Sequence, residues 1–144
     1  ALREVYHPDA PISGPGAEEF RAVRAAYFNG MTAQEIDAAI LAMAERENVA
    51  FVDVVLGLCM QRGAIDGDTP CRGQLECRPD KCKNAIITIK HRKAWRDALA
   101  ADQAKRRDPQ FAYAWDQLDE SIAEKEAVIA GIPGEPGVEV SSYA

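Results

Sequence analysis

Four cysteines lie in one short stretch of this 144-residue chain, and the rest of the sequence contains none. They are Cys59, Cys71, Cys77 and Cys82, with eleven, five and four residues between successive members. Four thiolates can close a tetrahedral shell around Zn2+, and the metal can then order a segment that is too polar to fold alone. Because a closed shell leaves no open coordination position, we expect this zinc to be structural rather than catalytic.

Several other uses of these cysteines remain open. None of the spacings is the two-residue spacing of a zinc knuckle. Disulfides are less favoured because the sequence shows no secretory signal, and an iron–sulfur cluster is less favoured because the spacings differ from those of ferredoxins. The thiols could also carry no ligand at all. His91 could replace one cysteine as a zinc ligand, although it lies near the start of an expected helix.

Motifs of common catalytic sites are missing from the sequence. It contains no Gly-rich phosphate loop, no His-Glu-x-x-His and no Gly-x-Ser-x-Gly. The carboxylate pairs Glu18-Glu19 and Asp119-Glu120 are more simply explained as charges on helix surfaces. A cysteine nucleophile would need His91 as its base. The sequence therefore predicts a non-enzymatic region that takes no small-molecule substrate.

Charge is distributed unevenly along the chain. The net charge of −6 argues against nonspecific nucleic-acid binding by the whole surface. From Cys71 to Arg107, however, eleven Lys or Arg stand against four Asp or Glu, a net +7, so the remainder carries −13. Such a segment favours a phosphate backbone as partner, and the alternative is a solvated helix face balanced by the acidic segments of the same fold. The candidate DNA contacts are Lys90, Arg92, Lys93 and Arg96.

The sequence predicts a mainly α fold of the α+β class. Residues 1–16 are rich in Pro and Gly and should form a flexible lead-in, and residues 131–144 should form a flexible tail. Between them, residues 17–130 should form one zinc-stapled domain. Its expected elements are an N-terminal helical hairpin (17–28 and 32–46), a short strand pair beside the cysteine knuckle (50–56 and 85–88), and a C-terminal antiparallel helical hairpin (89–107 and 109–130).

Local patterns support the N-terminal hairpin. In its first helix, Phe20, Val23 and Tyr27 share the face that we expect to be buried. Thr32 and Glu35 have the spacing of a capping box, so they should begin the second helix.

The C-terminal hairpin has signals of its own. Thr88 should cap the long helix that carries Trp95, and Pro109 suits the first position of the next helix. Apolar residues then recur with steps of four and three, except where Lys125 interrupts, which predicts a seam that packs antiparallel on the Trp95 helix. No apolar run reaches membrane-spanning length, so we expect no membrane contact. The members of the seam are Phe111, Trp115, Leu118, Ile122 and Ile129.

The residues around the cysteines also match a known pattern. The stretch from Phe51 to Cys59, then Cys71, then Glu76 to Thr88, and finally Trp95-Arg96 resembles the C-terminal region of large bacterial tyrosine recombinases, the integrases of mobile genetic elements. The similarity covers roughly residues 17–129 and is sharpest over 77–95. It implies DNA integration or excision as the function of the parent protein, and a structural metal site of four cysteines appended to the enzyme core.

The resemblance does not extend to the catalytic residues of that family. Such recombinases cut DNA with a tyrosine that is supported by arginines and a His-x-x-Arg element. Neither His7 nor His91 has Arg at the third following position, and Tyr143 lies in the expected tail without that context. No catalytic residue is therefore assigned to this chain.

Two hypotheses follow for the function. The first is a non-catalytic zinc-binding accessory domain of a cytoplasmic, tyrosine-recombinase-like integrase, which supports DNA binding or assembly with other subunits or with a catalytic domain. The second is a zinc-stabilised protein–protein interaction module with no direct DNA contact. The acidic remainder of the chain favours the second, and the basic segment together with the resemblance favours the first.

Overall fold

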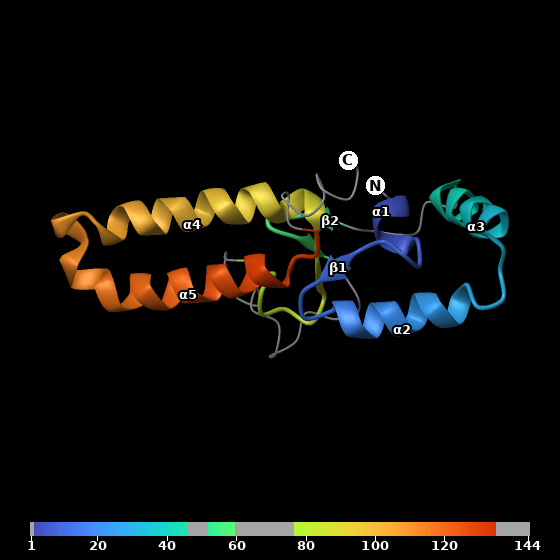
Figure 1. Ribbon diagram of the computed structural model, residues 1–144, viewed down its shortest axis with the longest axis horizontal. Coiled ribbons are helices and arrows are strands. Elements are labelled where there is room, and N and C mark those ends of the chain that lie inside the picture. Colours follow the sequence, from blue (N-terminus) through green and yellow to red (C-terminus); the bar gives the residue numbers. More distant parts are fainter. Residues whose placement is uncertain (1, 46–51, 60–76, 135–144) are drawn as a thin grey trace.

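The computed structural model describes residues 2–45, 52–59 and 77–134, so Cys71 lies outside the described residues. Helices dominate this part of the chain, and a small antiparallel sheet joins them (Figure 1). The mainly helical α+β class predicted from the sequence is confirmed. In chain order the elements are α1 (Leu2–Tyr6), β1 (Ile12–Ser13), α2 (Ala17–Tyr27), α3 (Ala33–Glu45), β2 (Val52–Asp53), β3 (Leu58–Cys59), β4 (Ala85–Thr88), the 3-10 helix η1 (Ile89–His91), α4 (Arg92–Arg106), the 3-10 helix η2 (Pro109–Ala114) and α5 (Trp115–Gly131).

The sheet is built around β4. Its strand order is β1-β4-β3-β2, and every neighbouring pair is antiparallel. All four residues of β4 are buried, as expected for a central apolar strand. Ile12 of β1 pairs with Thr88, and Cys59 of β3 pairs with Ala85. The predicted strand at 85–88 is therefore confirmed, but its predicted pairing with residues 50–56 is wrong, because β4 pairs with β1 and β3.

The strand predicted at 50–56 is different in the structure. Instead of one strand, β2 and β3 form a tight antiparallel hairpin, and residues 50 and 51 lie outside the described residues. The turn is closed by the amide of Val54, which donates to the carbonyl of Gly57. Val55 in this turn has a φ of 73°, a left-handed conformation that β-branched residues rarely adopt. An apolar run does not reveal such a turn, because its residues are all typical of strands.

Residues 2–16 are not the flexible lead-in predicted from the sequence. They contain α1 and β1, and the side chains of Val5 and Ile12 are each only 1% exposed. Both residues belong to a core cluster with Phe20, Leu58 and Ile86. The Pro and Gly residues of this segment shape turns between short packed elements, and turn residues alone do not distinguish that arrangement from a flexible segment.

The N-terminal helices are confirmed, but their packing differs from the prediction. The Thr32–Glu35 capping box is present, with the Glu35 amide 3.2 Å from the Thr32 hydroxyl and the Thr32 amide 2.9 Å from the Glu35 carboxylate. However, α3 makes its main contacts with α1 rather than α2. On α2 only Phe20 of the predicted face is buried, while Val23 and Tyr27 are about half exposed.

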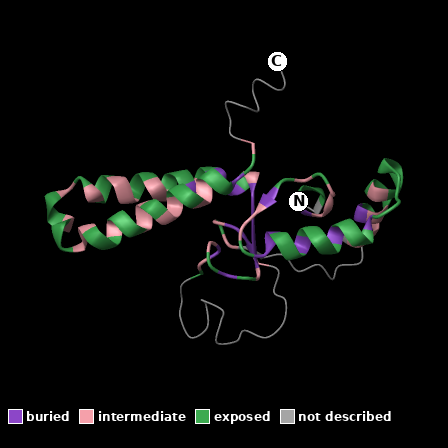
Figure 2. Cartoon of the chain, turned by 60° about the horizontal axis from the view of Figure 1, so that its bottom comes forward, coloured by how far each residue is buried: buried purple, intermediate pink, exposed green. Residues whose placement is uncertain are grey.

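The long C-terminal helices α4 and α5 pack antiparallel on each other and extend away from the sheet (Figure 1). This confirms the predicted C-terminal helix pair, except that residues 109–114 form a 3-10 helix rather than the first turns of α5. Buried residues gather near the sheet, and the helix pair is covered mainly by exposed and half-exposed residues (Figure 2). No side chain of α5 is fully buried.

The chain after α5 does not begin as the loose tail predicted for residues 131–144. Ile132 is only 2% exposed and packs with Ile87 of β4 and Trp95 of α4. The indole of Trp95 also donates a 2.7 Å hydrogen bond to the carbonyl of Leu56. The described part of this segment therefore closes the second core cluster, whereas residues 135–144 lie outside the described residues. No helix in the described part of the chain is long and apolar enough to cross a membrane.

Candidate functional site

The sheet register places two of the predicted zinc ligands on neighbouring segments. Cys59 ends β3 and pairs with Ala85, the first residue of β4. Cys82 lies three residues before Ala85, whose amide donates a 3.0 Å hydrogen bond to the Cys82 carbonyl. The Cys82 side chain is buried, while that of Cys59 is half-buried. The first and last cysteines of the sequence pattern therefore lie at the same end of the sheet.

A compact turn connects Cys82 to Cys77. The amides of Lys81 and Cys82 both donate to the carbonyl of Arg78, each at 3.0 Å. Pro79 within the turn is fully buried and packs against Gly57 of the β2–β3 hairpin. A Cβ atom on Gly57 would lie only 2.9 Å from the Pro79 Cβ, so glycine allows this close contact. The turn that carries two cysteines is thus packed on the hairpin that carries the third.

Three of the four predicted zinc ligands lie within the described residues. Cys59, Cys77 and Cys82 are thiols, and Cys77 is exposed. Within the described ranges, no group of three or more metal-binding side chains is assembled. Since Cys71 lies outside those ranges, the four-cysteine site stays a prediction.

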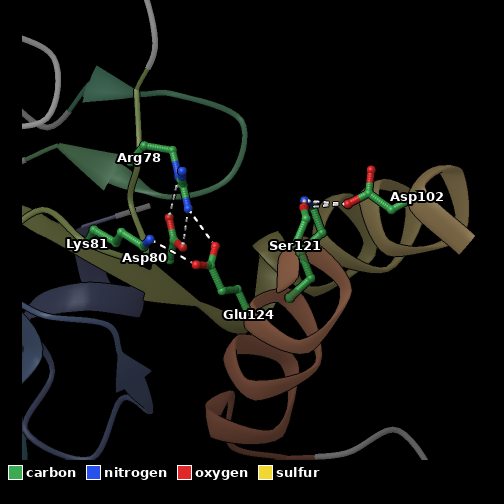
Figure 3. Close-up of polar contacts among 7 residues, drawn as sticks. Arg78, Asp80, Lys81, Asp102, Ser121 and Glu124 are labelled. Carbon is green, nitrogen blue, oxygen red and sulfur yellow. Dashed lines mark hydrogen bonds and ion pairs between the residues drawn. The ribbon is translucent and has the colours of Figure 1, made fainter. Parts of the chain in front are cut away.

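Two cations of the turn bind one carboxylate of α5. Arg78 Nη2 lies 2.8 Å from Oε2 of Glu124, and Lys81 Nζ lies 2.9 Å from Oε1 (Figure 3). Arg78 also donates to both carboxylate oxygens of Asp80, at 3.2 and 3.1 Å. The hydrogen bond from Lys81, together with the charges of both cations, lowers the pKa of Glu124. Glu124 is therefore ionised at neutral pH and holds the cysteine turn against the helix pair.

A cavity of about 340 Å³ lies beside this bridge, between the turn and α5. Its lining includes the apolar side chains of Trp95 and Leu56, the predicted zinc ligand Cys77, and charged groups of both signs. Ser121 and Lys125 of α5 connect the cavity to a second polar cluster with Asp102 of α4.

The second cluster has residue types found in catalytic sites, but its geometry indicates a structural role. Ser121 Oγ lies 2.5 Å from Lys125 Nζ, and both groups donate to Asp102 Oδ2, at 2.6 and 2.7 Å. Burial would raise the pKa of Asp102, but the hydrogen bonds from Lys125 and Ser121 outweigh it and lower the pKa. The carboxylate is thus ionised. Lys125 donates to the Ser121 hydroxyl and does not accept from it, so in this arrangement the amine is not a base for Ser121.

The four predicted DNA contacts occupy different environments. Lys90, Lys93 and Arg96 are exposed, and Lys93 pairs with Asp97 at 2.6 Å, one helical turn further along. Arg92 is only 5% exposed and donates to the carbonyl of Pro133. Its guanidinium therefore fastens the chain after α5 to the start of α4. A periodic basic run does not show which of its members faces inward.

His91, the proposed substitute ligand, caps a helix. The side chain is 2% exposed, and its Nδ1 accepts the amide of Thr88 at 3.0 Å. The Thr88 hydroxyl oxygen also lies 3.0 Å from the same ring nitrogen. The predicted capping role of Thr88 is confirmed, and this contact leaves Nε2 as the ring atom that could serve a metal.

Sequence reasoning missed the Glu124 bridge and the Asp102 cluster. Glu124 and the turn are more than forty residues apart, so no local spacing connects them. Only the i,i+4 spacing of Ser121 and Lys125 gave a signal, and that spacing is common on helix surfaces. Comparisons with protein-family models, curated proteins and solved structures found no match to this chain.

Proposed function

We propose that this chain is a non-catalytic accessory domain of a tyrosine-recombinase-like integrase, in which Cys59, Cys71, Cys77 and Cys82 hold one structural Zn2+. The metal stabilises the junction between the sheet and the α4–α5 pair. The domain thereby supports DNA binding or assembly with other subunits during site-specific recombination. The family assignment rests on the resemblance described above.

One observation carries the metal part of this proposal. The antiparallel register of β3 and β4 puts Cys59 beside the segment that begins at Cys82, and the 77–82 turn packs on the same hairpin. This approach of backbone segments more than twenty residues apart in the sequence supports the proposed zinc site. Thiolates are the preferred zinc ligands of closed structural sites.

Zinc content and thiol reactivity test the proposal together. The protein purified without added metal should contain one zinc per chain, and four thiols should react with a thiol reagent only after chelation. Cys82→Ser should lose the zinc and lower the melting temperature, because structural zinc contributes folding free energy. Leu41→Ala, an exposed change on α3, is the control and should keep the metal. A metal-free protein that melts like the purified one would rule out a structural metal.

DNA contact is the less supported part of the accessory role. Of the four predicted contacts, Arg92 is buried and its guanidinium binds the Pro133 carbonyl, so the test uses Lys90 and Arg96, which are both exposed. Changing both to Gln should weaken DNA binding and reduce the slope of log affinity against log salt by about two. The control changes Lys105 and Arg107, exposed basic residues at the other end of α4, to Gln.

The second candidate is an interaction module without DNA contact. It is favoured by the helix pair, because α4 and α5 cover only one side of each other and leave no side chain of α5 fully buried. A partner could cover the remaining faces. If the domain shows no affinity for DNA even at low salt, while zinc is present in full, the second candidate replaces the first.

A further inference from the structure

We propose that the connection between α4 and α5 is a binding surface for single-stranded DNA, on which the ring of Tyr113 stacks against an unpaired base. This connection, here called the hairpin tip, comprises residues 105–115 and lies at the end of the helix pair that is far from the sheet (Figure 1). The inference rests on the DNA-binding part of the proposed function and names the form of DNA and the contact. It involves none of the cysteines.

Aromatic residues are concentrated at the hairpin tip, whereas buried residues gather near the sheet (Figure 2). Phe111, Tyr113 and Trp115 are three of the ten Phe, Tyr and Trp residues in the chain. No residue of η2 is buried, and no side chain of α5 is fully buried. Tyr113 is 81% exposed and belongs to neither core cluster. Packing of the helix pair therefore does not account for this tyrosine.

The Tyr113 ring is held in place but stays open to a ligand. It stacks on the ring of Phe111, with the centroids 6.4 Å apart and 28° between the planes. Phe111 is half-buried and so anchors Tyr113 to the helix pair. A ring that is already held in place loses less conformational freedom when a base stacks on it. The bases of duplex DNA are stacked on each other, so this ring suits an unpaired base.

Two cations of the hairpin tip can bind phosphates of the same strand. The Lys105 ammonium lies 6.0 Å from the centre of the Phe111 ring, and Arg107 is the C-cap of α4. Both residues are exposed, and neither side chain forms an ion pair with the described parts of the chain. Cations also suit the negative end of a helix, which explains their position but not the exposed aromatic ring beside them. Cations together with an open aromatic ring are typical of surfaces that bind single strands.

Acidic residues limit the electrostatic part of this binding. Asp108 caps η2 by accepting the Gln110 amide at 2.9 Å, and Asp119 pairs with Arg106 at 2.7 Å. Asp116 is exposed and would repel a phosphate. The stacked base must therefore supply most of the affinity. Asp116→Asn should strengthen single-strand binding about twofold, the opposite sign to a change that removes a cation.

The test is a titration at low salt, followed by fluorescence anisotropy, of a labelled oligothymidine strand and of a duplex of the same length. Tyr113→Ala should weaken single-strand binding about tenfold and leave duplex binding within about twofold. Tyr113→Trp should keep the affinity for the strand, because an indole also stacks, and Tyr113→Leu should lose it. The matched control is Tyr27→Ala, which removes another exposed tyrosine that contacts a phenylalanine, Phe28.

Salt dependence and stability give two further readouts. Changing Lys105 and Arg107 to Gln, the control for duplex binding, should weaken the single strand and lower its salt slope by about 1.4, since each phosphate contributes about 0.7. Because Tyr113 is exposed, its variants should melt within about 2 °C of the unchanged protein. Equal losses for strand and duplex in Tyr113→Ala would overturn the stacking role.

Each remaining outcome also decides the inference. A Tyr113→Ala variant that binds the strand as tightly as the unchanged protein overturns it. An oligouridine that binds more than about tenfold tighter than the DNA strand would assign the surface to RNA, and a polyglutamate peptide that competes equally well would assign it to acidic proteins; both results overturn it. Duplex binding without strand binding removes this inference alone. Strand binding through Tyr113 without zinc or duplex affinity keeps it and removes the proposed function.

Discussion

Replacing Ile132 by Ala tests whether the chain after α5 is part of the core. The side chain is 2% exposed and packs with Ile87 and Trp95. The substitution removes three carbon groups, which corresponds to about 2.4 kcal/mol of lost transfer free energy at about 0.8 kcal/mol each. The cavity left behind adds to this, so the free energy of unfolding should fall by about 3 kcal/mol. For a chain of this size the melting temperature should drop by about 6–12 °C.

Urea unfolding followed by tryptophan fluorescence and circular dichroism measures this loss. Trp95 contacts the substituted residue, so fluorescence reports the site directly, while circular dichroism reports the helices. Leu41→Ala is the control, since Leu41 is 63% exposed and its loss should change stability by less than about 0.5 kcal/mol. A loss below about 1 kcal/mol for Ile132→Ala would show that this residue is not packed as described, and the reasoning would fail.

Three further substitutions test other parts of the fold by the same unfolding measurement. Arg24→Leu should lower the free energy of unfolding by about 2–3 kcal/mol. The buried guanidinium donates 2.8 Å hydrogen bonds to the backbone carbonyls of residues 5 and 10, and the substitution would leave both carbonyls without this partner. Gly57→Ala should cost about 1–3 kcal/mol through its clash with Pro79, whereas Gly131→Ala, with nothing near its added Cβ, should be neutral or stabilising. Asp102→Asn should cost about 1–2 kcal/mol at pH 7. Since the pKa of Asp102 is lowered in the folded state, this difference should be complete above about pH 4 and vanish as pH falls through the folded pKa; a difference that is constant with pH would contradict it.

Local sequence signals were sufficient for most of the helices and the central strand. The Thr32–Glu35 and Thr88 caps begin helices as expected, since capping depends on residues within one turn of each other. The apolar seam from Phe111 onward predicted the helix pair, because it too depends on residues that are three or four positions apart. What the sequence could not show was which faces meet. Val23 shares a face with the buried Phe20, yet it stays half exposed because α3 packs elsewhere.

In the candidate site, too, local sequence signals identified some residues and the tertiary structure was needed for others. Clustering and residue type singled out the cysteines, and the strand register supports the proximity of Cys59 and Cys82. The role of Glu124 needed the tertiary structure, because its partners are far away in sequence. The burial of Arg92 likewise depends on the chain that returns after α5 to meet it. The surroundings of Glu124 and Arg92 both depend on contacts between residues far apart in the sequence. Neither helical periodicity nor composition predicts such contacts.

The place of β1 in the sheet sets the order in which this chain can fold. Ile12 must find Thr88 across a span of more than seventy residues, and closing such a long loop is slow and entropically costly. Helices α4 and α5 are joined by a short connection and can pair as soon as both exist. During synthesis the first strand emerges long before its partner, so we expect the N-terminal residues to wait undocked until β4 is made. A nascent chain halted before residue 85 should therefore be open to proteases at its N-terminal end.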